Sequence, residues 1–339
     1  MSLKVFYDSR KNQIFFIYAF IFILLISLFI AISFGSFDTS FWKYLNGELD
    51  DLQEKVLFQI RFPRVILAAF VGASLAFSGS CLQALFRNPL ADPGLIGVSS
   101  GAALGAATSI VLASSYLPSF LGPFLLPFFA IAGSFLVIAL LFVITKGFGY
   151  NGVTYMLLAG IAINALAGVG IGILTYISDD VELRGLTFWT MGSFGSASWE
   201  LITPAIIIIF ITIFITLKES RKLDLIQLGE FEAARLGVDV KKLKRSIIIS
   251  SAIVVGVSVS LTGMIGFVGL VVPHIIRLIG GVNHKYLLKG SIFFGALIMV
   301  LADLLSRIII SPAELPVGLI TSAIGAPFFL WLIFKMRKI

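Results

Sequence analysis

The chain has 339 residues, of which 58% are hydrophobic and 13% are charged. A soluble domain carries about a quarter charged residues, so this composition excludes an ordinary soluble protein. Apolar runs near 20 residues predict a polytopic α-helical membrane protein, because a β-barrel would show alternating segments of about 10 residues. The net charge of +7 fits Lys and Arg gathered in cytoplasmic loops, so we expect no nucleic-acid partner.

Ten apolar elements follow one another along the chain. They are 14–34, 62–84, 94–115, 123–145, 153–177, 200–218, 246–267, 270–280, 289–310 and 315–334. The first is long for a signal-peptide core, so we interpret it as a retained span. The eighth is shorter than the roughly 20 residues that cross a bilayer, which indicates a tilted or broken element. We predict an all-α fold of about ten transmembrane helices, forming one transmembrane domain over residues 1–339.

Positive charges predict the orientation. They gather in both tails and in segment 218–245, whereas 35–60 and 177–199 hold few. The tail residues are Lys4, Arg10, Lys11, Lys335, Arg337 and Lys338. By the positive-inside rule, both termini and segment 218–245 are cytoplasmic, and membrane lipid surrounds the spans.

The sequence lacks the motifs of several enzyme classes. It contains no GxxxxGK[ST] phosphate loop, no HExxH motif and no GxSxG elbow, and its single Cys81 excludes a disulfide framework. We therefore predict no enzyme activity, no metal site and no cofactor in this chain. Asp303 is the best candidate for an ion relay, although Arg307 at i+4 is a natural structural partner for it.

Small or polar residues recur every fourth position in two spans. This spacing places them on a shared helix face, where they allow close helix packing or line a pathway. Asn164 favours a polar lumen, because an amide that faces lipid is costly. The residues are Gly160, Asn164, Gly168 and Gly172 in the fifth span, and Gly318, Ser322 and Ala326 in the tenth.

Two segments predict breaks in the helical pattern. RNPLADPGLIGVSSGAALGAA (87–107) contains Pro89 and Pro93, which cannot sit inside a helix without loss of backbone hydrogen bonds. GMIGFVGLVVPHIIR (263–277) places three glycines before Pro273. Irregular backbone at membrane depth has to be buried in protein or wet.

Three arginines are predicted at the outer face, where the positive-inside rule disfavours them. Arg61 and Arg64 belong to RFPR, and Arg307 precedes the SPAELP turn (311–316). Their side chains either snorkel to the interface or form a patch that docks an acidic partner.

A charged, helix-favouring segment, GEFEAARLGVDVKKLKR (229–245), separates two strongly apolar runs. Gly237 is a plausible C-terminal cap for a short helix over EFEAARLG. Such a helix could lie on the membrane or fit a groove of a soluble partner. Its mixed charges favour the protein groove.

Several of these blocks resemble the FecCD family, the permeases that import iron chelates and cobalamin as membrane subunits of type II ABC importers. They are RFPRVILAAFVGASLAFSGSCLQALFRNPLADPGLIGVSSGA, GMIGFVGLVVPHIIRLIGG, AELPVGLITSAIGAPFFLWLI and GEFEAARLGV. The resemblance runs from about residue 60 to the C-terminus. Residues 38–59 match no family pattern.

The resemblance implies a type II ABC importer permease fold with ten spans, in the cytoplasmic (inner) membrane of a bacterium or archaeon. It implies a second permease subunit, taken as an identical copy, two cytoplasmic ATPases that carry ATP-Mg, and an extracytoplasmic binding protein. The coupling segment would be 219–245. The implied coupling helix consists of Glu230, Glu232, Ala233, Ala234, Arg235, Leu236 and Gly237.

The resemblance also implies docking of the binding protein on Arg61, Arg64 and Arg307. The implied pathway is lined by Leu95, Ser99, Ser100, Gly160, Asn164, Gly168, Gly318 and Ser322. We expect the substrate to be a siderophore-type iron chelate, with haem, cobalamin or an oxyanion such as molybdate as alternatives. An ion-coupled secondary transporter is the remote alternative.

Overall fold

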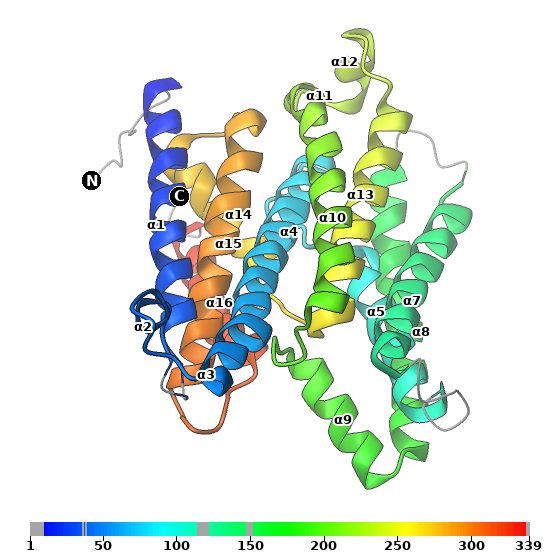
Figure 1. Ribbon diagram of the computed structural model, residues 1–339. Helices are drawn as coiled ribbons and strands as arrows, with labels where there is room; N and C mark the ends of the chain where they lie inside the picture. The colour runs from blue at the N-terminus through cyan, green and yellow to red at the C-terminus, as the bar shows by residue number, and fades with distance from the viewer. Residues whose placement is uncertain (1–9, 36, 38, 114–121, 147–151, 337–339) are drawn as a thin grey trace. The chain divides into compact units, whose positions relative to one another are not determined.

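A computed structural model describes most of the chain (Figure 1). The described residues are 10–35, 37, 39–113, 122–146 and 152–336. Every regular element among them is helical, which confirms the all-α prediction. Lys4, Arg337 and Lys338, on which the predicted orientation partly rests, lie outside the described residues.

The helices have the following bounds. They are α1 (Arg10–Ser33), α2 (Phe41–Leu45), α3 (Asp51–Lys55), η1 (Val56–Arg61), α4 (Phe62–Phe86), η2 (Pro93–Ile96), α5 (Val98–Thr108), η3 (Ser109–Ala113), α7 (Gly122–Ile144), α8 (Gly152–Ile177), α9 (Asp180–Met191), α10 (Trp199–Thr216), η6 (Leu217–Glu219), α11 (Ser220–Ile226), α12 (Glu230–Arg235), α13 (Val240–Thr262), α14 (Val268–Gly280), α15 (His284–Ile308) and α16 (Val317–Met336).

Eight helical stretches among the described residues are long and apolar enough to cross a membrane. Two shorter apolar stretches, Val98–Ala113 and Val268–Gly280, complete the series. These ten stretches match the ten predicted apolar elements in order. The short eighth element is α14, which has only 13 residues.

The described residues fall into two compact units. Unit 1 comprises Met1–Ser80, Ser193–Ile207 and Ile265–Ile339, and unit 2 comprises Cys81–Gly192 and Ile208–Met264. Two helices, α4 and α10, continue from one unit into the other along the chain. The statement that the chain acts as a single domain stays a prediction.

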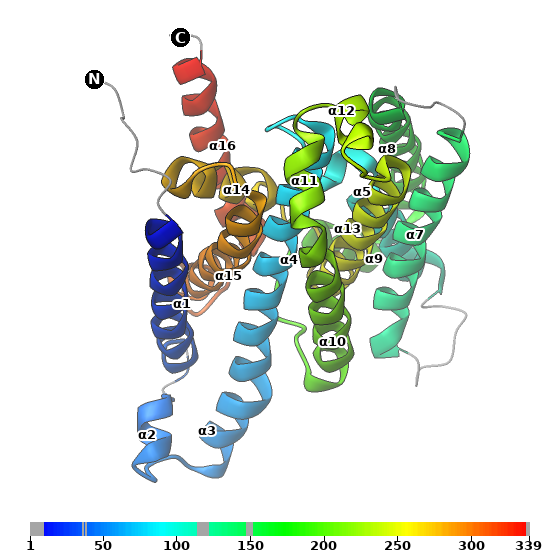
Figure 2. The same ribbon diagram turned by 90° about the horizontal axis from the view of Figure 1, so that it is seen from above.

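In unit 1, glycines bring helices into close contact. A Cβ on Gly72 of α4 would overlap the main-chain oxygen of Gly295 in α15, and a Cβ on Gly79 would overlap that of Gly269 in α14. Helices α1, α14, α15 and α16 lie side by side in both views (Figures 1 and 2). Small residues thus form the packing surface of α4 against α14 and α15, as is common between membrane helices.

In unit 2, α5 packs against α7, α8 and α13. A Cβ on Gly101 would overlap the main-chain oxygen of Gly133, and a Cβ on Gly105 that of Phe129. Ser134 of α7 donates a hydrogen bond to Val98 O at 3.1 Å. The small-residue helix predicted after the Pro/Gly turn is therefore the centre of this unit.

Both predicted breaks are present. The first lies between α4 and α5, where Arg87 and Gly97 have positive φ values of 49° and 87°. The second lies between α13 and α14, where Gly263 and Phe267 have φ values of 72° and 67°. Pro273 itself lies within α14, so the chain breaks before this proline rather than at it.

Residues 38–59, for which the sequence made no prediction, contain two short helices and most of a π-helical segment. Ser40 caps α2, and Asp50 caps α3 through a reciprocal capping box with Gln53. Helices α3, η1 and α4 then run on without interruption, giving one helical stretch from Asp51 to Phe86.

Candidate functional site

The predicted coupling helix is α12, which connects α11 to α13 in unit 2 (Figure 1). Its C-terminus forms a Schellman motif: Gly237 N donates to Ala234 O and Val238 N donates to Ala233 O, both at 3.0 Å. Gly237 has a φ of 89°, as predicted for the residue that ends this helix. Ala233 is fully buried and anchors the motif to the protein.

A buried ion pair attaches the other end of α12 to the membrane helix that follows. Lys244 Nζ of α13 lies 2.6 Å from Glu230 Oε2, and both side chains are 9% exposed. Glu230 therefore faces α13, and it is not part of the exposed surface of the predicted coupling helix. Burying two charges is costly unless they pair with good geometry. Because the pair has to stay together, it holds the start of α12 against α13.

The opposite side of α12 is exposed and partly apolar. Phe231 and Leu236 are 63% and 57% exposed. The Arg235 guanidinium lies over the Phe231 ring, 6.0 Å from its centroid, and 3.5 Å from Glu232 Oε1. Ala234 is exposed on the same short helix. We define Phe231, Glu232, Arg235 and Leu236 as the α12 surface.

Arg61 does not project from the protein. It is 5% exposed and caps the end of α1. Its Nη1 donates to Thr39 O at 2.6 Å and to Ile32 O and Ser33 O at 3.3 Å each, and its Nη2 donates to Phe37 O at 2.5 Å. The last carbonyls of a helix lack intrahelical partners, and a guanidinium satisfies several of them at once.

Arg307 of α15 serves the same helix end. It is 5% exposed and donates to Ala31 O at 3.0 Å and to Phe34 O at 3.1 Å. Its Nε lies 3.2 Å from Asp303 Oδ2, the i,i+4 pair expected from the sequence. The angle does not suit a hydrogen bond, because the same Nε–H is directed to the main-chain oxygen of Asp303 at 3.4 Å.

Arg64 has a different set of partners. Its Nε donates to the buried Asp303 Oδ1 at 2.8 Å, and its Nη1 donates to both carboxylate oxygens of Glu314 at 2.9 and 2.8 Å. We define Arg64, Asp303, Arg307 and Glu314 as the arginine–acid network. The docking role predicted for the arginines stays a prediction, and the ion-relay candidate Asp303 is paired with two arginines.

The turn before α5 is fixed by its own polar groups. Asp92 caps η2 by accepting a hydrogen bond from Gly94 N at 2.8 Å. Burial raises the pKa of Asp92 above its ordinary value. Asn164 of α8 donates to Gly94 O at 2.9 Å and accepts from Ser100. The polar atoms of Asn164 and Ser100, both predicted to line a pathway, thus hold the turn against α8.

The predicted small-residue face of α8 is not a single face. Gly160 is buried, and a Cβ there would overlap Leu95 O, whereas nothing lies within 4 Å of a Cβ on Gly168 or Gly172. Four residues turn an α-helix by about 400°, so each step drifts by about 40°. The stripe therefore rotates from a packed surface at Gly160 to an open one at Gly168.

The remaining pathway candidates have mixed environments. Leu95 and Ser99 are half-buried in unit 2. In unit 1, Gly318 is buried near the start of α16 and Ser322 is half-buried one turn later. Gly318 O accepts a hydrogen bond from Thr321 Oγ1 at 3.1 Å.

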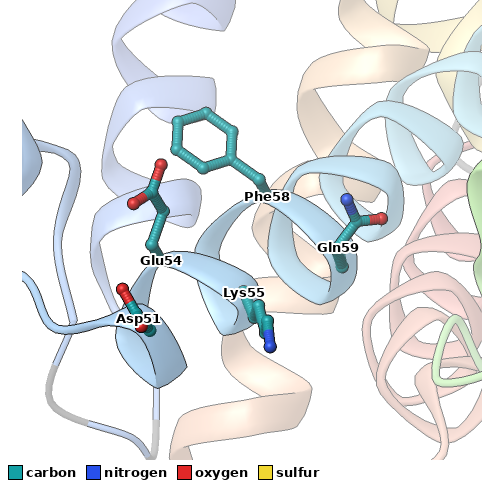
Figure 3. A pocket seen from close by; sticks show the side chains of 5 residues that line it. All are labelled: Asp51, Glu54, Lys55, Phe58 and Gln59. Atoms are coloured by element: carbon teal, nitrogen blue, oxygen red, sulfur yellow. The ribbon is translucent and has the colours of Figure 1, made fainter.

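An open depression of about 350 Å³ lies along α3 and η1 (Figure 3). It is lined by Asp51, Glu54, Lys55, Phe58 and Gln59. None of the predicted pathway residues lines it, and its walls come from one continuous helical surface. Among the described residues, no group of three or more His, Cys, Asp or Glu side chains is arranged to hold a metal ion.

Sequence reasoning missed three features of these sites. Lys244 was not identified as the partner of Glu230, and Glu314 was not identified as the partner of Arg64. Helix α9 lies in segment 177–199, for which no helix was predicted, and it begins with a capping box between Asp179 and Glu182. That box could have been found, because an acidic cap followed three residues later by Glu is a helix-start signal.

Comparison with known proteins identifies the family of this chain. The model of the FecCD transport family matches residues 23–335. The chain belongs to the FecCD transport family. It is 45% identical over 320 residues to the hemin transport system permease protein HmuU of Yersinia pestis, covering 94% of this chain and 95% of that protein.

Two further proteins are similar to this chain over most of its length. The chain is 40% identical over 287 residues to the vitamin B12 import system permease protein BtuC of Vibrio parahaemolyticus, covering 85% of each. A solved structure, described as an inward-facing conformation of a metal-chelate type ABC transporter, matches with a TM-score of 0.84 and 34% identity, covering 94% of this chain and 98% of that one. This FecCD protein is therefore a multi-pass permease subunit of a type II ABC importer.

Proposed function

We propose that this FecCD permease imports an iron chelate that a binding protein delivers, driven by two cytoplasmic ATPases. The α12 surface is the observation that carries the proposal. It is exposed, partly apolar and charged with both signs, and the buried Glu230–Lys244 pair joins its helix to α13. A partner that moves α12 would therefore act on a membrane helix, as an ATP-driven importer requires.

Haem is the first substrate to test. The relative with 45% identity over nearly the full chain is named a hemin permease, and haem is an iron chelate. Cobalamin is the second candidate, because several relatives at 37–40% identity are named vitamin B12 permeases. Both ligands are bulky macrocycles, so a lumen of weakly polar and small residues suits either one.

The partners follow from the family. A second permease copy completes the pathway, and the binding protein docks on the side that carries Arg61, Arg64 and Arg307. The pathway residues that we propose are Leu95, Ser99, Ser100, Asn164, Gly168, Gly318 and Ser322, whereas Gly160 packs against Leu95. Its open section starts near Gly168, where the stripe of α8 leaves the packed surface. The N- and C-termini face the cytoplasm.

The test is purification of the tagged chain from its native membrane in mild detergent, with identification of every co-purifying subunit. We expect a stoichiometric ATPase, which is lost from the E232K/R235E variant because its charges are reversed, and from F231A/L236A because its apolar contacts are removed. K285A is the matched control, since Lys285 is exposed at the start of α15 and lies outside the coupling segment. The ligand extracted from the binding protein identifies the substrate.

The contrary result is equally clear. A chain that purifies alone and moves solute into liposomes under an ion gradient would be a secondary transporter. The relay residue would then be Asp303, and D303N would abolish that transport. If both α12 variants keep the ATPase, the coupling role of α12 is wrong, but the proposed import function is not affected.

A further inference from the structure

The three arginines predicted to dock a binding protein differ in how they are held. Arg61 donates to Ile32 O and Ser33 O, and Arg307 donates to Ala31 O, so both serve main-chain carbonyls at the end of α1. Arg64 makes two of its hydrogen bonds to the carboxylate of Glu314. A main-chain carbonyl of a helix end cannot leave without unwinding the helix, whereas a side-chain carboxylate can rotate away. Arg64 is therefore the arginine whose partner is exchangeable.

The two acids of the arginine–acid network are not equivalent. The Asp303 side chain is 0% exposed, whereas the Glu314 side chain is 43% exposed. Removing a buried partner leaves an uncompensated buried charge. An exposed carboxylate, in contrast, is hydrated again when it dissociates from the arginine. Of the two, only Glu314 can leave Arg64 at low cost.

The backbone beneath Glu314 is fixed independently of its side chain. Glu314 lies in the turn between α15 and α16, where Leu315 N donates to Ser306 O at 2.9 Å and Ala313 N donates to Ile310 O at 3.0 Å. These bonds flank Glu314 and do not involve its carboxylate. The side chain can therefore change rotamer while the turn keeps its shape.

Charge balance sets a condition on docking. Arg64 and Arg307 carry two positive charges, and Asp303 and Glu314 carry two negative charges. A further carboxylate arriving at this neutral, largely buried network would meet Glu314 as a like charge. If Glu314 turns into water, the incoming carboxylate restores neutrality and takes over its two hydrogen bonds.

We propose that Glu314 is an internal counter-ion that occupies Arg64 until a carboxylate of the binding protein replaces it. The proposal rests on the proposed function, because it presupposes that a binding protein docks here. Glu314 then weakens docking by competing for the same guanidinium, since the competent state is only the fraction in which Arg64 is free. This competition allows an unloaded or departing binding protein to leave quickly.

The experiment measures association of the co-purified binding protein with the permease complex in nanodiscs, by biolayer interferometry, for the wild type and E314Q. The substituted glutamine keeps the shape of the glutamate side chain but loses its charge. We expect the dissociation constant to fall about fivefold, equivalent to about 1 kcal/mol. The affinity should also depend more steeply on salt, because the arginine–acid network then carries a net positive charge.

E48Q is the matched control. Glu48 is an exposed carboxylate between α2 and α3 in the same unit, and its hydrogen bond with Asn46 Nδ2 at 3.1 Å can be kept by a glutamine. We expect E48Q to bind as the wild type does. E314D, which keeps the charge on a shorter side chain, should bind with intermediate affinity, and it provides a second variant if E314Q is poorly folded.

The outcomes separate the inference from the function. If the wild type docks the binding protein and E314Q docks it equally well or more weakly, Glu314 is not a competitor and the inference is wrong. If neither the wild type nor E314Q binds although E314Q melts at the same temperature as the wild type, the proposed docking of the binding protein fails and the exchange fails with it.

Discussion

Lys244 Nζ and Glu230 Oε2 lie 2.6 Å apart, and their side chains are buried although both belong to the most charged segment of the chain. Glu230 opens α12 and Lys244 lies in the first turns of α13. The pair therefore ties a short helix, which alone is too short to be stable in water, to a helix of membrane length.

This pair predicts a non-additive mutant cycle. E230Q or K244Q alone leaves a buried charge without its partner, which costs about 3–5 kcal/mol. The double variant E230Q/K244Q leaves two neutral amides that can bond each other, so we expect its melting temperature to recover most of the loss. Thermal unfolding in detergent measures the cycle, and ATPase co-purification should follow the same order.

The control for this cycle is the exposed pair on the same helix. Glu232 and Arg235 lie 3.5 Å apart with side chains 51% and 67% exposed, so E232Q should shift the melting temperature little. Equal and additive losses for E230Q and K244Q would show that the buried pair does not couple the two helices.

The α1 cap predicts a structural role for Arg61. R61A removes four hydrogen bonds to main-chain oxygens, two at the end of α1 and two shortly after it, and leaves these carbonyls without their guanidinium partner. Because each unsatisfied buried acceptor costs about 1–3 kcal/mol, we expect low yield and a melting temperature lower by about 5 °C or more. Yield and thermal unfolding in detergent measure both effects.

Arg184 provides the comparison for Arg61. It is exposed on α9, so R184A should leave yield and melting temperature unchanged. An R61A protein as stable as the wild type would remove the capping role and leave Arg61 available for docking. Charge reversal at Arg61 therefore cannot test docking by itself, because it also disrupts the end of α1.

The membrane helices could be predicted from the sequence because each needs about 20 apolar residues in a row, a local property. The breaks at Gly97 and Gly263 were likewise marked by Gly and Pro in the sequence. Glu230 and Lys244 are different, because a charged residue in a loop is expected to be exposed. Only the packing of α12 onto α13 buries the pair.

The arginines show the same limit over longer distances. Arg64 meets Glu314 across 250 positions of sequence, and Arg307 reaches Phe34 across 273. A residue pattern identifies such arginines as unusual for an outer face. It does not indicate whether their hydrogen bonds go to the carbonyls of a helix end or to acidic side chains. The drift of the α8 stripe, by contrast, follows from helix geometry alone and could have been foreseen.

Glycine packing predicts a contrast between two alanine substitutions. G79A places a Cβ against the main chain of Gly269, where neither backbone can give way, so α4 and α14 have to move apart. G168A places a Cβ in open space. We expect G79A to lower the melting temperature by about 5 °C or more, since overpacking costs about 1–3 kcal/mol, and G168A to leave it unchanged. Thermal unfolding of both variants in one detergent decides the point, and equal melting temperatures would contradict the close approach of α4 and α14.

The turn before α5 predicts a pH-dependent difference between the wild type and D92N. Asn can still accept the hydrogen bond from Gly94 N, but it carries no charge to bury.

The raised pKa of Asp92 means that the folded protein holds the proton of this carboxyl more tightly than the unfolded chain does. The stability that the protonated carboxyl contributes is complete below the unfolded pKa of about 3.9 and is lost as the pH rises through the folded pKa. We therefore expect D92N to match the wild type at the acid end and to melt at a higher temperature than the wild type at neutral pH. D239N is the control, because Asp239 caps the exposed start of α13. Melting temperatures recorded across the pH range measure the difference, and a D92N advantage that stays constant with pH would show that the charge of Asp92 is not what the fold opposes.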